Sequence, residues 1–256
     1  MPTPDTILII PAAGAGTRLQ SSVPKVLAPV AGTPMIDHLF DLYRDFVQRF
    51  VLVVHPSCDR AVRDHCRAAA PHLSVDFAHQ PEPTGMLDAI LLAADSVRAS
   101  GTRRVWITWC DQVGVHPDTI DELCRWSAGT DAADVILPTA RQADPYIHIE
   151  RDTSSRIVNI RQRREGDQMP PIGESDIGLF SLSAAVYFER LPEFSREASR
   201  AAETRERNFL PFIPWLSERA GSIVTFPCTD PVEAIGVNTQ TDRERIEQYL
   251  REREEQ

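Results

Sequence analysis

The chain has 256 residues, of which 42% are hydrophobic and 25% are charged, as is usual for a globular protein with one large α/β domain or two small ones. Its formal net charge of -10 argues against a general nucleic-acid binder but permits a local basic pocket for phosphates. Its five cysteines are scattered without a C-x-x-C pair, which argues against a disulfide framework or a zinc site.

The N-terminus carries no basic leader region, and the first apolar run is too short to span a bilayer, so we expect a cytoplasmic protein without a membrane partner. That run, residues 6–10, is uncharged and rich in isoleucine, which predicts a strand buried on both faces. The loop that follows, residues 11–18, contains small residues and two glycines. Its backbone can approach a ligand closely, and its amide hydrogens can face an anion.

Two basic residues follow in this connection. Arg18 ends the loop, and a guanidinium can grip phosphate through its planar fork. Lys25 is the only lysine in a chain with 27 lysines and arginines. A compact ammonium kept at one place, seven residues after Arg18, favours a point charge fitted among phosphate oxygens over a chance position.

Known glycine-rich templates separate the possible functions of the loop. A dinucleotide fingerprint needs glycine at position 19, where Leu19 stands, and a P-loop needs lysine directly after Gly16, where Thr17 stands. The chain instead reads A-A-G-x-G-T-R, followed after a spacer by P-K-V-L and then A-G-T-P-M-I. This pattern resembles the sugar-1-phosphate nucleotidylyltransferases, closest to the uridylyltransferase domain of bacterial N-acetylglucosamine-1-phosphate uridyltransferase.

The resemblance implies roles for the loop and for the two basic side chains. Arg18 would hold the departing β- and γ-phosphates, and Lys25 would neutralise charge on the α-phosphate. The resemblance also places a short stretch of the loop against the nucleotide, namely Ala12, Ala13, Gly14, Gly16 and Thr17.

Alternating strand and helix patterns follow the loop. Apolar residues at helical spacing predict a helix over residues 35–47, and we expect strands at 50–54 and 73–78 with a helix at 59–69 between them. This alternation predicts a mainly parallel sheet with helices on both faces, a Rossmann-like α/β fold that binds ligands beyond the carboxyl ends of its strands.

A turn-rich segment over residues 80–86 opens a helix expected at 87–97. It resembles the segment in which the family reads the nucleobase, and this assigns Gln80, Thr84 and Gly85 to nucleotide binding. Gln80 offers both a donor and an acceptor, as a pyrimidine edge requires, although an ordinary loop with a helix cap explains the pattern equally well.

A strand expected over residues 105–109 leads to Asp111. The family places here an aspartate that binds the catalytic Mg²⁺, and an acid at the end of a central strand is a sound ligand for a hard cation. Cys110 stands where the family has glycine, and we expect it to be small, buried and unreactive.

The pattern changes to an antiparallel one after residue 131, with strands expected at 144–149, 156–160 and 176–182. In the resembling family this half forms the lid over the sugar, which assigns Tyr146, Gln162 and Asp176 to the acceptor. Gln162 and Asp176 replace the glutamate and asparagine of the family, so we expect a different acceptor. Arginines at 161, 163 and 164 could hold an anionic acceptor, but a solvated charged turn explains them at least as well.

The C-terminal part is expected to hold an apolar helix from Thr204 through Trp215, a strand at 222–227 and a final helix at 242–251. Between the last two, E-x-x-G-V-N at 233–238 matches a family segment, and this implies that Asn238 completes the Mg²⁺ site. No hexapeptide repeats follow, so we expect the acetyltransferase half of the bifunctional relative to be absent.

Together these patterns predict one nucleotidyltransferase domain over 1–256, divided into a nucleotide-binding half (1–140), an acceptor-binding half (141–230) and a metal-site segment with the last helix (231–256). The resemblance implies Mg²⁺-dependent transfer from a nucleoside triphosphate, UTP first, to a sugar 1-phosphate or similar acceptor. A CTP-dependent enzyme acting on a phosphonate or polyol phosphate remains an alternative. A nucleotide sensor without catalysis is a further alternative, against which a complete metal site argues. The oligomeric state is left open.

Overall fold

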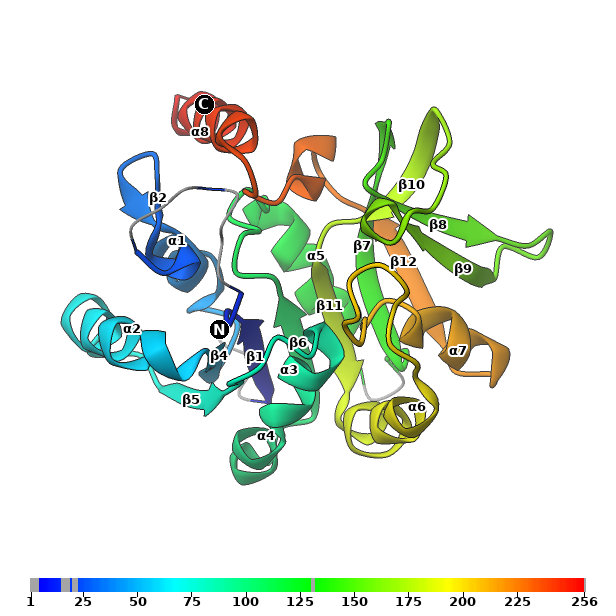
Figure 1. The fold of residues 1–256 in the computed structure, drawn as a ribbon, viewed down its shortest axis with the longest axis horizontal. Helices are drawn as coiled ribbons and strands as arrows, with labels where there is room; N and C mark the ends of the chain where they lie inside the picture. Colours follow the sequence, from blue (N-terminus) through cyan, green and yellow to red (C-terminus); the bar gives the residue numbers. More distant parts are fainter. Residues whose placement is uncertain (1–4, 15–18, 20–22, 130–131, 256) are drawn as a thin grey trace.

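The computed structural model describes residues 5–14, 19, 23–129 and 132–255. Eight strands form one sheet in the order β10-β7-β11-β6-β1-β4-β5, with β12 paired to β7 (Figure 1). The strands are β1 Thr6–Pro11, β4 Arg49–Val54, β5 Val75–His79, β6 Arg104–Thr108, β7 Val135–Ala143, β10 Ile172–Asp176, β11 Leu179–Ser183 and β12 Ile223–Pro227.

The half of the sheet formed by β6, β1, β4 and β5 is parallel, since β1 pairs in parallel with both β4 and β6, and β4 with β5. The other half is mixed. Strand β11 runs antiparallel to β6 and β7, and β10 runs antiparallel to β7, whereas β12 is parallel to β7. The expected α/β fold with a mainly parallel sheet is therefore confirmed.

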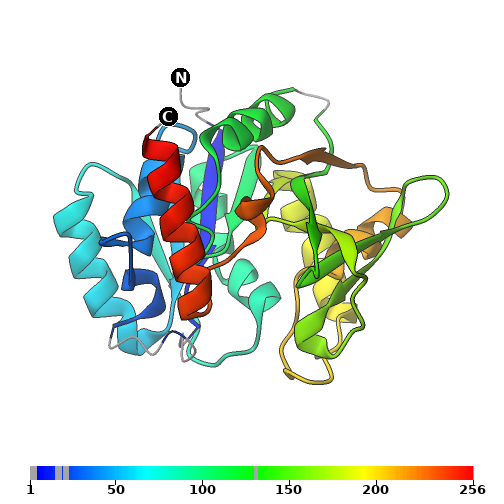
Figure 2. The same ribbon diagram turned by 90° about the horizontal axis from the view of Figure 1, so that it is seen from above.

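Helices cover both faces of the sheet, as Figure 2 shows from above. Alternate residues of β1 lie on opposite faces of the sheet. Leu8 and Ile10 belong to one core, Ile7 and Ile9 belong to the other, and all four are fully buried. The first core packs against α1 Met35–Tyr43, α2 Pro56–Ala69, α5 Pro117–Ser127 and α8 Gln240–Glu254. The second packs against α3 Met86–Leu92, α4 Ala94–Ser100, α6 Leu191–Glu197 and α7 Phe212–Glu218.

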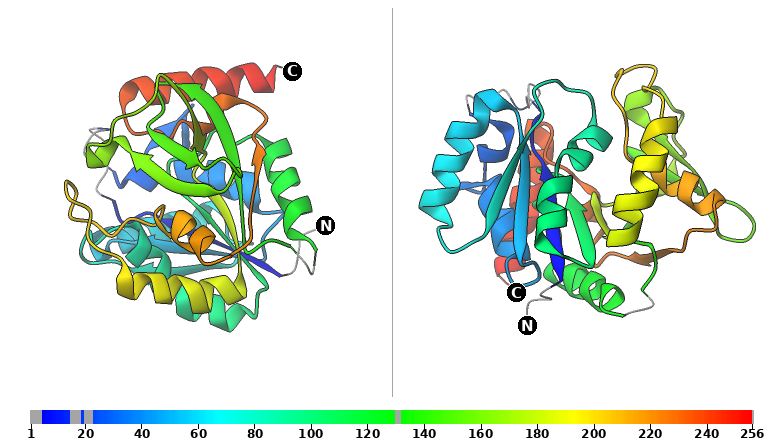
Figure 3. Two further views of the ribbon diagram at one scale, coloured as in Figure 1. Left: turned by 90° about the vertical axis from the view of Figure 1, so that its right-hand side faces the viewer. Right: turned by 90° about the horizontal axis from the view of Figure 1, so that it is seen from below.

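A smaller antiparallel unit projects from the sheet beside β10. Strands β8 Ile147–Arg151 and β9 Ile157–Gln162 form a hairpin, and the views of Figure 3 show α7 next to it. The short strands β2 Pro29–Val30 and β3 Thr33–Pro34 form a separate pair. Short helical segments complete the chain: the 3₁₀ turns η2 Lys25–Leu27, η3 Arg163–Glu165 and η5 Pro231–Ala234, and the π-helical η4 Val186–Arg190.

Several expected elements differ from those observed. The helix expected at 87–97 is two helices, because Ala93 donates to Ile90 in a tightened turn. The strand expected at 176–182 is broken, because the Asp176 carboxylate folds back to accept from the Gly178 amide at 2.8 Å. The strand expected from residue 144 begins at Ile147, after Asp144 with a φ of 47°.

The helix expected from Thr204 begins only at Phe212, and this expectation was wrong for a definite reason. The Arg207 amide donates to Thr84 O at 2.7 Å, and Arg207 O accepts from the Leu87 amide at 3.0 Å. A backbone committed to another segment cannot make helical bonds. Arg205 also has a φ of 60°, which lies outside the helical region.

All five cysteines are free, as expected. Cys110 is buried, and burial raises the pKa of its thiol to about 12, which agrees with an unreactive residue. No helix in the described part of the chain is both long enough and apolar enough to cross a membrane.

Candidate active site

Three side chains from distant parts of the sequence meet beyond the carboxyl end of β6. Lys25 Nζ donates to Asp111 Oδ2 at 2.5 Å and to Asn238 Oδ1 at 2.9 Å. The side chains of Lys25 and Asp111 are only 11% and 12% exposed, so this ion pair is shielded from water. The sequence analysis singled out all three residues, and the fold places them in direct contact.

The two oxygen-bearing residues are held together through the backbone as well. The Val237 amide donates to the Asp111 carbonyl at 3.0 Å. A Cβ on Gly236 would lie 3.2 Å from Asp111 Oδ1 and 3.3 Å from Asn238 Nδ2. This close approach explains why glycine precedes Val237 and Asn238: a larger residue would push the Asp111 and Asn238 side chains apart.

The residues present fit a divalent cation. Asp111 and Asn238 aim one oxygen each at a single point, and that point holds the Lys25 ammonium, itself a cation. Mg²⁺ commonly takes one or two protein oxygens and completes its shell with water and phosphate oxygens. Among the described residues there is no cluster of three or more His, Cys, Asp or Glu side chains that could hold a metal alone. A Mg²⁺ held here would therefore take water or phosphate oxygens as its further ligands.

The glycine-rich loop leaves the sheet beside this site. The Ala12 amide donates to Val53 O at 2.7 Å, and Ala12 is buried, whereas Ala13 is half-buried. Gly14 is exposed, and a Cβ on it would meet no atom of the described residues within 4 Å. The remaining loop residues assigned to phosphate binding, Gly16, Thr17 and Arg18, lie outside the described residues.

The segment assigned to the nucleobase forms hydrogen bonds within itself. Gln80 is buried, and its amide nitrogen donates to Gly85 O at 2.9 Å and to Thr84 Oγ1 at 3.2 Å. Gln80, Thr84, Asp88 and Leu91 line a cavity of about 410 Å³. The structure thus brings Gln80, Thr84 and Gly85 together, with the Gln80 amide nitrogen already engaged.

The three residues assigned to the acceptor do not form one cluster. Gln162 lies opposite Ile147 in the β8–β9 hairpin. Tyr146 directly precedes Ile147 and is 46% exposed. Asp176 is instead buried at the end of β10. Its Oδ2 has no hydrogen-bond partner among the described residues, and burial raises the pKa of Asp176 to about 6.

The arginines at the lid do not converge on an acceptor either. Arg161 pairs with Glu150 at 2.5 Å, Arg164 with Glu206 at 2.8 Å, and Arg163 with Asp144. Each of the three arginines thus has its own carboxylate partner, which agrees with the interpretation as a charged surface turn.

Residues 204–208, here termed the bridging segment, join two distant parts of the molecule and were missed by sequence reasoning. At the beginning of α3, the Arg207 guanidinium pairs with Asp88 at 2.5 Å, and the Arg207 backbone bonds to Thr84 and Leu87. At η3, Glu165 accepts from Thr204 Oγ1 at 2.8 Å and from Asn208 Nδ2 at 3.1 Å. Burial raises the pKa of Glu165, but these hydrogen bonds outweigh that effect and lower it overall.

Glu233 was also missed as a structural residue, although it lies in the recognised E-x-x-G-V-N segment. The sequence contained a usable signal, because Asp230 and Glu233 have the spacing of a capping box around Pro231–Ala234. The structure contains that capping box, and Glu233 is fully buried.

Comparison with known proteins identifies relatives of this chain. The family model described as MobA-like NTP transferase domain matches residues 8–171. Two curated relatives are named bifunctional protein GlmU. The one from Solibacter usitatus is 26% identical over 99% of this chain and 53% of its own length, and the one from Geobacter metallireducens is 28% identical over 97% and 51%. The chain thus spans about half the length of the curated relatives it matches.

A solved structure shares the fold. The inositol-1-phosphate CTP transferase from T. maritima aligns with a TM-score of 0.68 over 95% of both chains, at 18% identity. The molecule therefore shares the fold of this solved transferase.

Proposed function

The chain belongs to the family of MobA-like NTP transferases, and on this basis we propose a Mg²⁺-dependent nucleotidylyltransferase that acts on a phosphorylated small-molecule acceptor. The observation that carries the proposal is the convergence of Lys25, Asp111 and Asn238 on one point. Residues 1–140 would bind the nucleotide, residues 141–230 the acceptor, and residues 231–256 would complete the metal site.

In the proposed reaction, a phosphate oxygen of the acceptor attacks the α-phosphorus of the nucleoside triphosphate in line, and pyrophosphate leaves. Such a transfer depends on positioning and on charge stabilisation more than on proton transfer. Lys25 would leave Asp111 and place its ammonium against the α-phosphate, and Arg18 would hold the departing phosphates. Asp111 and Asn238 would hold the Mg²⁺, which when bound neutralises charge on the phosphate oxygens.

UTP is the first choice of donor because the curated relatives with the GlmU name resemble the chain over nearly all of its length. CTP is the second candidate, because the solved structure with the same fold is described as a CTP transferase. The engaged amide nitrogen of Gln80 leaves its carbonyl oxygen as the group to contact a base. A carbonyl oxygen would accept from the N3–H of uracil or from the amino group of cytosine.

For the acceptor, the replacements at Gln162 and Asp176 suggest a compound other than N-acetylglucosamine 1-phosphate. The buried Asp176 Oδ2, which has no partner among the described residues, calls for a hydrogen-bond donor such as a hydroxyl or an N–H group. We therefore propose a phosphorylated acceptor that presents a hydroxyl or amino group toward Asp176.

The test is pyrophosphate release with each of the four triphosphates against a panel of sugar 1-phosphates, polyol phosphates and phosphonates, with and without Mg²⁺. We expect metal-dependent release with one pyrimidine triphosphate and slow turnover of N-acetylglucosamine 1-phosphate. The Asp111→Asn variant serves as the inactive control. No release with any pair, while nucleotide still binds, would support a sensor and overturn the enzyme.

A further inference from the structure

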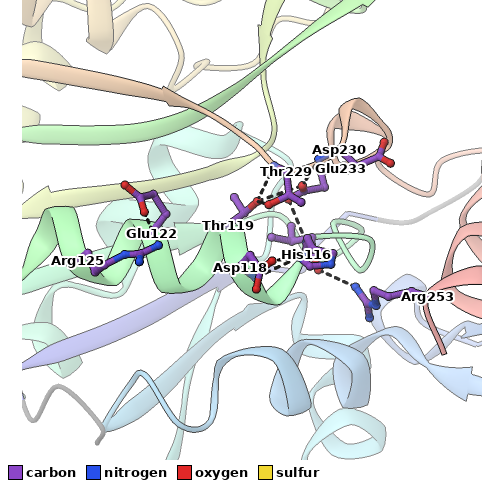
Figure 4. A network of polar contacts seen from close by, with 10 residues as sticks. His116, Asp118, Thr119, Glu122, Arg125, Thr229, Asp230, Glu233 and Arg253 are labelled. Atoms are coloured by element: carbon purple, nitrogen blue, oxygen red, sulfur yellow. Dashed lines mark hydrogen bonds and ion pairs between the residues drawn. The ribbon is translucent and has the colours of Figure 1, made fainter. Parts of the chain in front are cut away.

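The side chain of Glu233 is fully buried in the protein. The residue is 0% exposed, and its side chain accepts three hydrogen bonds (Figure 4). Glu233 Oε2 accepts from the His116 amide at 3.0 Å, and Oε1 accepts from Thr119 Oγ1 at 3.0 Å and from the Asp230 amide at 2.7 Å. Burial raises the pKa of Glu233, the largest effect on it, although these bonds favour the charged form.

These bonds join two segments that are distant in the sequence. His116 is the N-cap of α5 and Thr119 lies in its first turn, whereas Asp230 and Glu233 belong to the turn at η5. The Thr119 hydroxyl also accepts from the Thr229 amide at 3.0 Å. Glu233 is thus the central acceptor that fastens η5 to the beginning of α5.

Both segments run from this point to the candidate active site. One leads back from His116 to Asp111, and the other leads forward from Glu233 to Asn238. At the far end they are fastened again by the bond from the Val237 amide to Asp111 O, at 3.0 Å. The two segments, 111–116 and 233–238, are therefore tied near both ends, and Arg253 of α8 adds a bond to Val115 O at 3.1 Å.

We propose that Glu233 is a positioning residue that sets the spacing between the side-chain oxygens of Asp111 and Asn238, and so determines how tightly the site holds a divalent metal. Glu233 contacts neither the Lys25 ammonium nor the two proposed ligands in any bond described above. The inference rests on the proposed function, because it presupposes a metal at Asp111 and Asn238. Groups behind metal ligands commonly change metal affinity by 10- to 100-fold.

The test measures Mn²⁺ affinity by electron paramagnetic resonance, in the presence of a non-hydrolysable UTP or CTP analogue, for the unchanged protein and for Glu233→Gln. Glutamine keeps the shape but turns an NH₂ group toward donors that need an acceptor. We expect the affinity for Mn²⁺ to fall by about 10-fold or more. Glu122→Gln is the matched control. Glu122 lies on α5, the helix to which Glu233 is bonded, but it pairs only with Arg125 in the described contacts, so Mn²⁺ affinity should stay within about twofold.

Two changes at Thr119 keep the proposal testable if Glu233→Gln folds poorly. Thr119→Val removes the hydroxyl that bonds to Glu233 and should weaken Mn²⁺ binding, whereas Thr119→Ser retains it and should restore the affinity. Equal Mn²⁺ affinity in the unchanged protein, Glu233→Gln and Thr119→Val would overturn the positioning role and leave the proposed function standing. No Mn²⁺ binding by the unchanged protein would overturn both.

Discussion

The Lys25 side chain is only 11% exposed, so its ammonium has little spare room. A substitution at this position can therefore test its role. Guanidinium is wider and planar, so Lys25→Arg should place its charge too far from the α-phosphate. A misplacement of about 1 Å can cost on the order of 100-fold in rate. We expect kcat to fall by about that factor, while the protein folds and binds nucleotide normally.

The measurement is steady-state pyrophosphate release together with nucleotide affinity for both proteins. Because every other lysine or arginine of the chain is an arginine, the substitution introduces a residue type that the protein already uses widely. Turnover close to that of the unchanged protein would mean that the lone lysine is an accident of composition.

Asp111 offers a second test at the level of one residue. Asp111→Asn removes the negative charge from the proposed metal site, and we expect pyrophosphate release to fall by about 100-fold or more. The amide oxygen can still accept from Lys25, so the melting temperature should change by only a few degrees. A loss of thermal stability that accounts for the loss of activity would contradict a role as metal ligand.

Asp176 links stability to pH. Its pKa is raised from 3.8 to about 6 in the folded protein by burial, so the unfolded chain ionises more readily than the native one. Stability should therefore fall as pH rises from about 4 to 6 and then stay level with respect to this group. Asp176→Asn removes the buried charge and should raise the free energy of unfolding by about 2–3 kcal/mol at pH 7.

The measurement is urea unfolding of both proteins at pH 4 and pH 7. The gain should be present at pH 7 and largely absent at pH 4, where the unchanged Asp176 is protonated. Asp95→Asn, at an exposed carboxylate on α4, should show no such difference. A gain of the same size at both pH values would mean that the effect does not arise from the buried charge.

At the scale of elements, Gly85 is where the turn before α3 meets the bridging segment. Its φ is 118°, and a Cβ there would lie 2.4 Å from both the backbone nitrogen and oxygen of Arg207. Gly85→Ala should force these segments apart and cost about 2–5 kcal/mol from strain and overpacking. Thermal unfolding measures this loss, and proteolysis near residues 204–208 should become faster.

Gly14→Ala is the control, because a Cβ on Gly14 meets no atom of the described residues within 4 Å. We expect this variant to unfold like the unchanged protein. If Gly85→Ala is equally harmless, the contact between the turn and the bridging segment does not contribute to stability.

Elements defined by their own composition were predictable from the sequence. Thr6–Ile10 forms a strand buried on both faces, as its uncharged apolar run indicated, and the alternation after it gave the parallel part of the sheet. The bridging segment was not predictable, because Arg207 bonds to Thr84 and Leu87, more than a hundred residues earlier. Apolar spacing in the sequence cannot show that a backbone is already paired elsewhere.

At the scale of the whole molecule, the candidate site was predictable where motifs carried it. Lys25, Asp111 and Asn238 come from three separated patterns, and the fold brings them together. The acceptor side was less predictable, since Gln162 lies on the β8–β9 hairpin and Tyr146 directly precedes it, while Asp176 is buried at the end of β10, opposite Thr139 of the main sheet. Pairing between side chains of the lid, such as Arg161 with Glu150, depends on tertiary contacts that no local pattern records.

The bridging segment is bonded to two parts of the molecule. It bonds to Thr84, Leu87 and Asp88 at the beginning of α3 and to Arg164 and Glu165 at η3. In the proposed function, a nucleotide bound beside Thr84 would change the free energy of this segment, and the segment would pass that change to the residues proposed to bind the acceptor. Because such coupling is reciprocal, a bound acceptor would change nucleotide affinity by the factor by which nucleotide changes acceptor affinity. Selection of one substrate would thereby also be selection of the other.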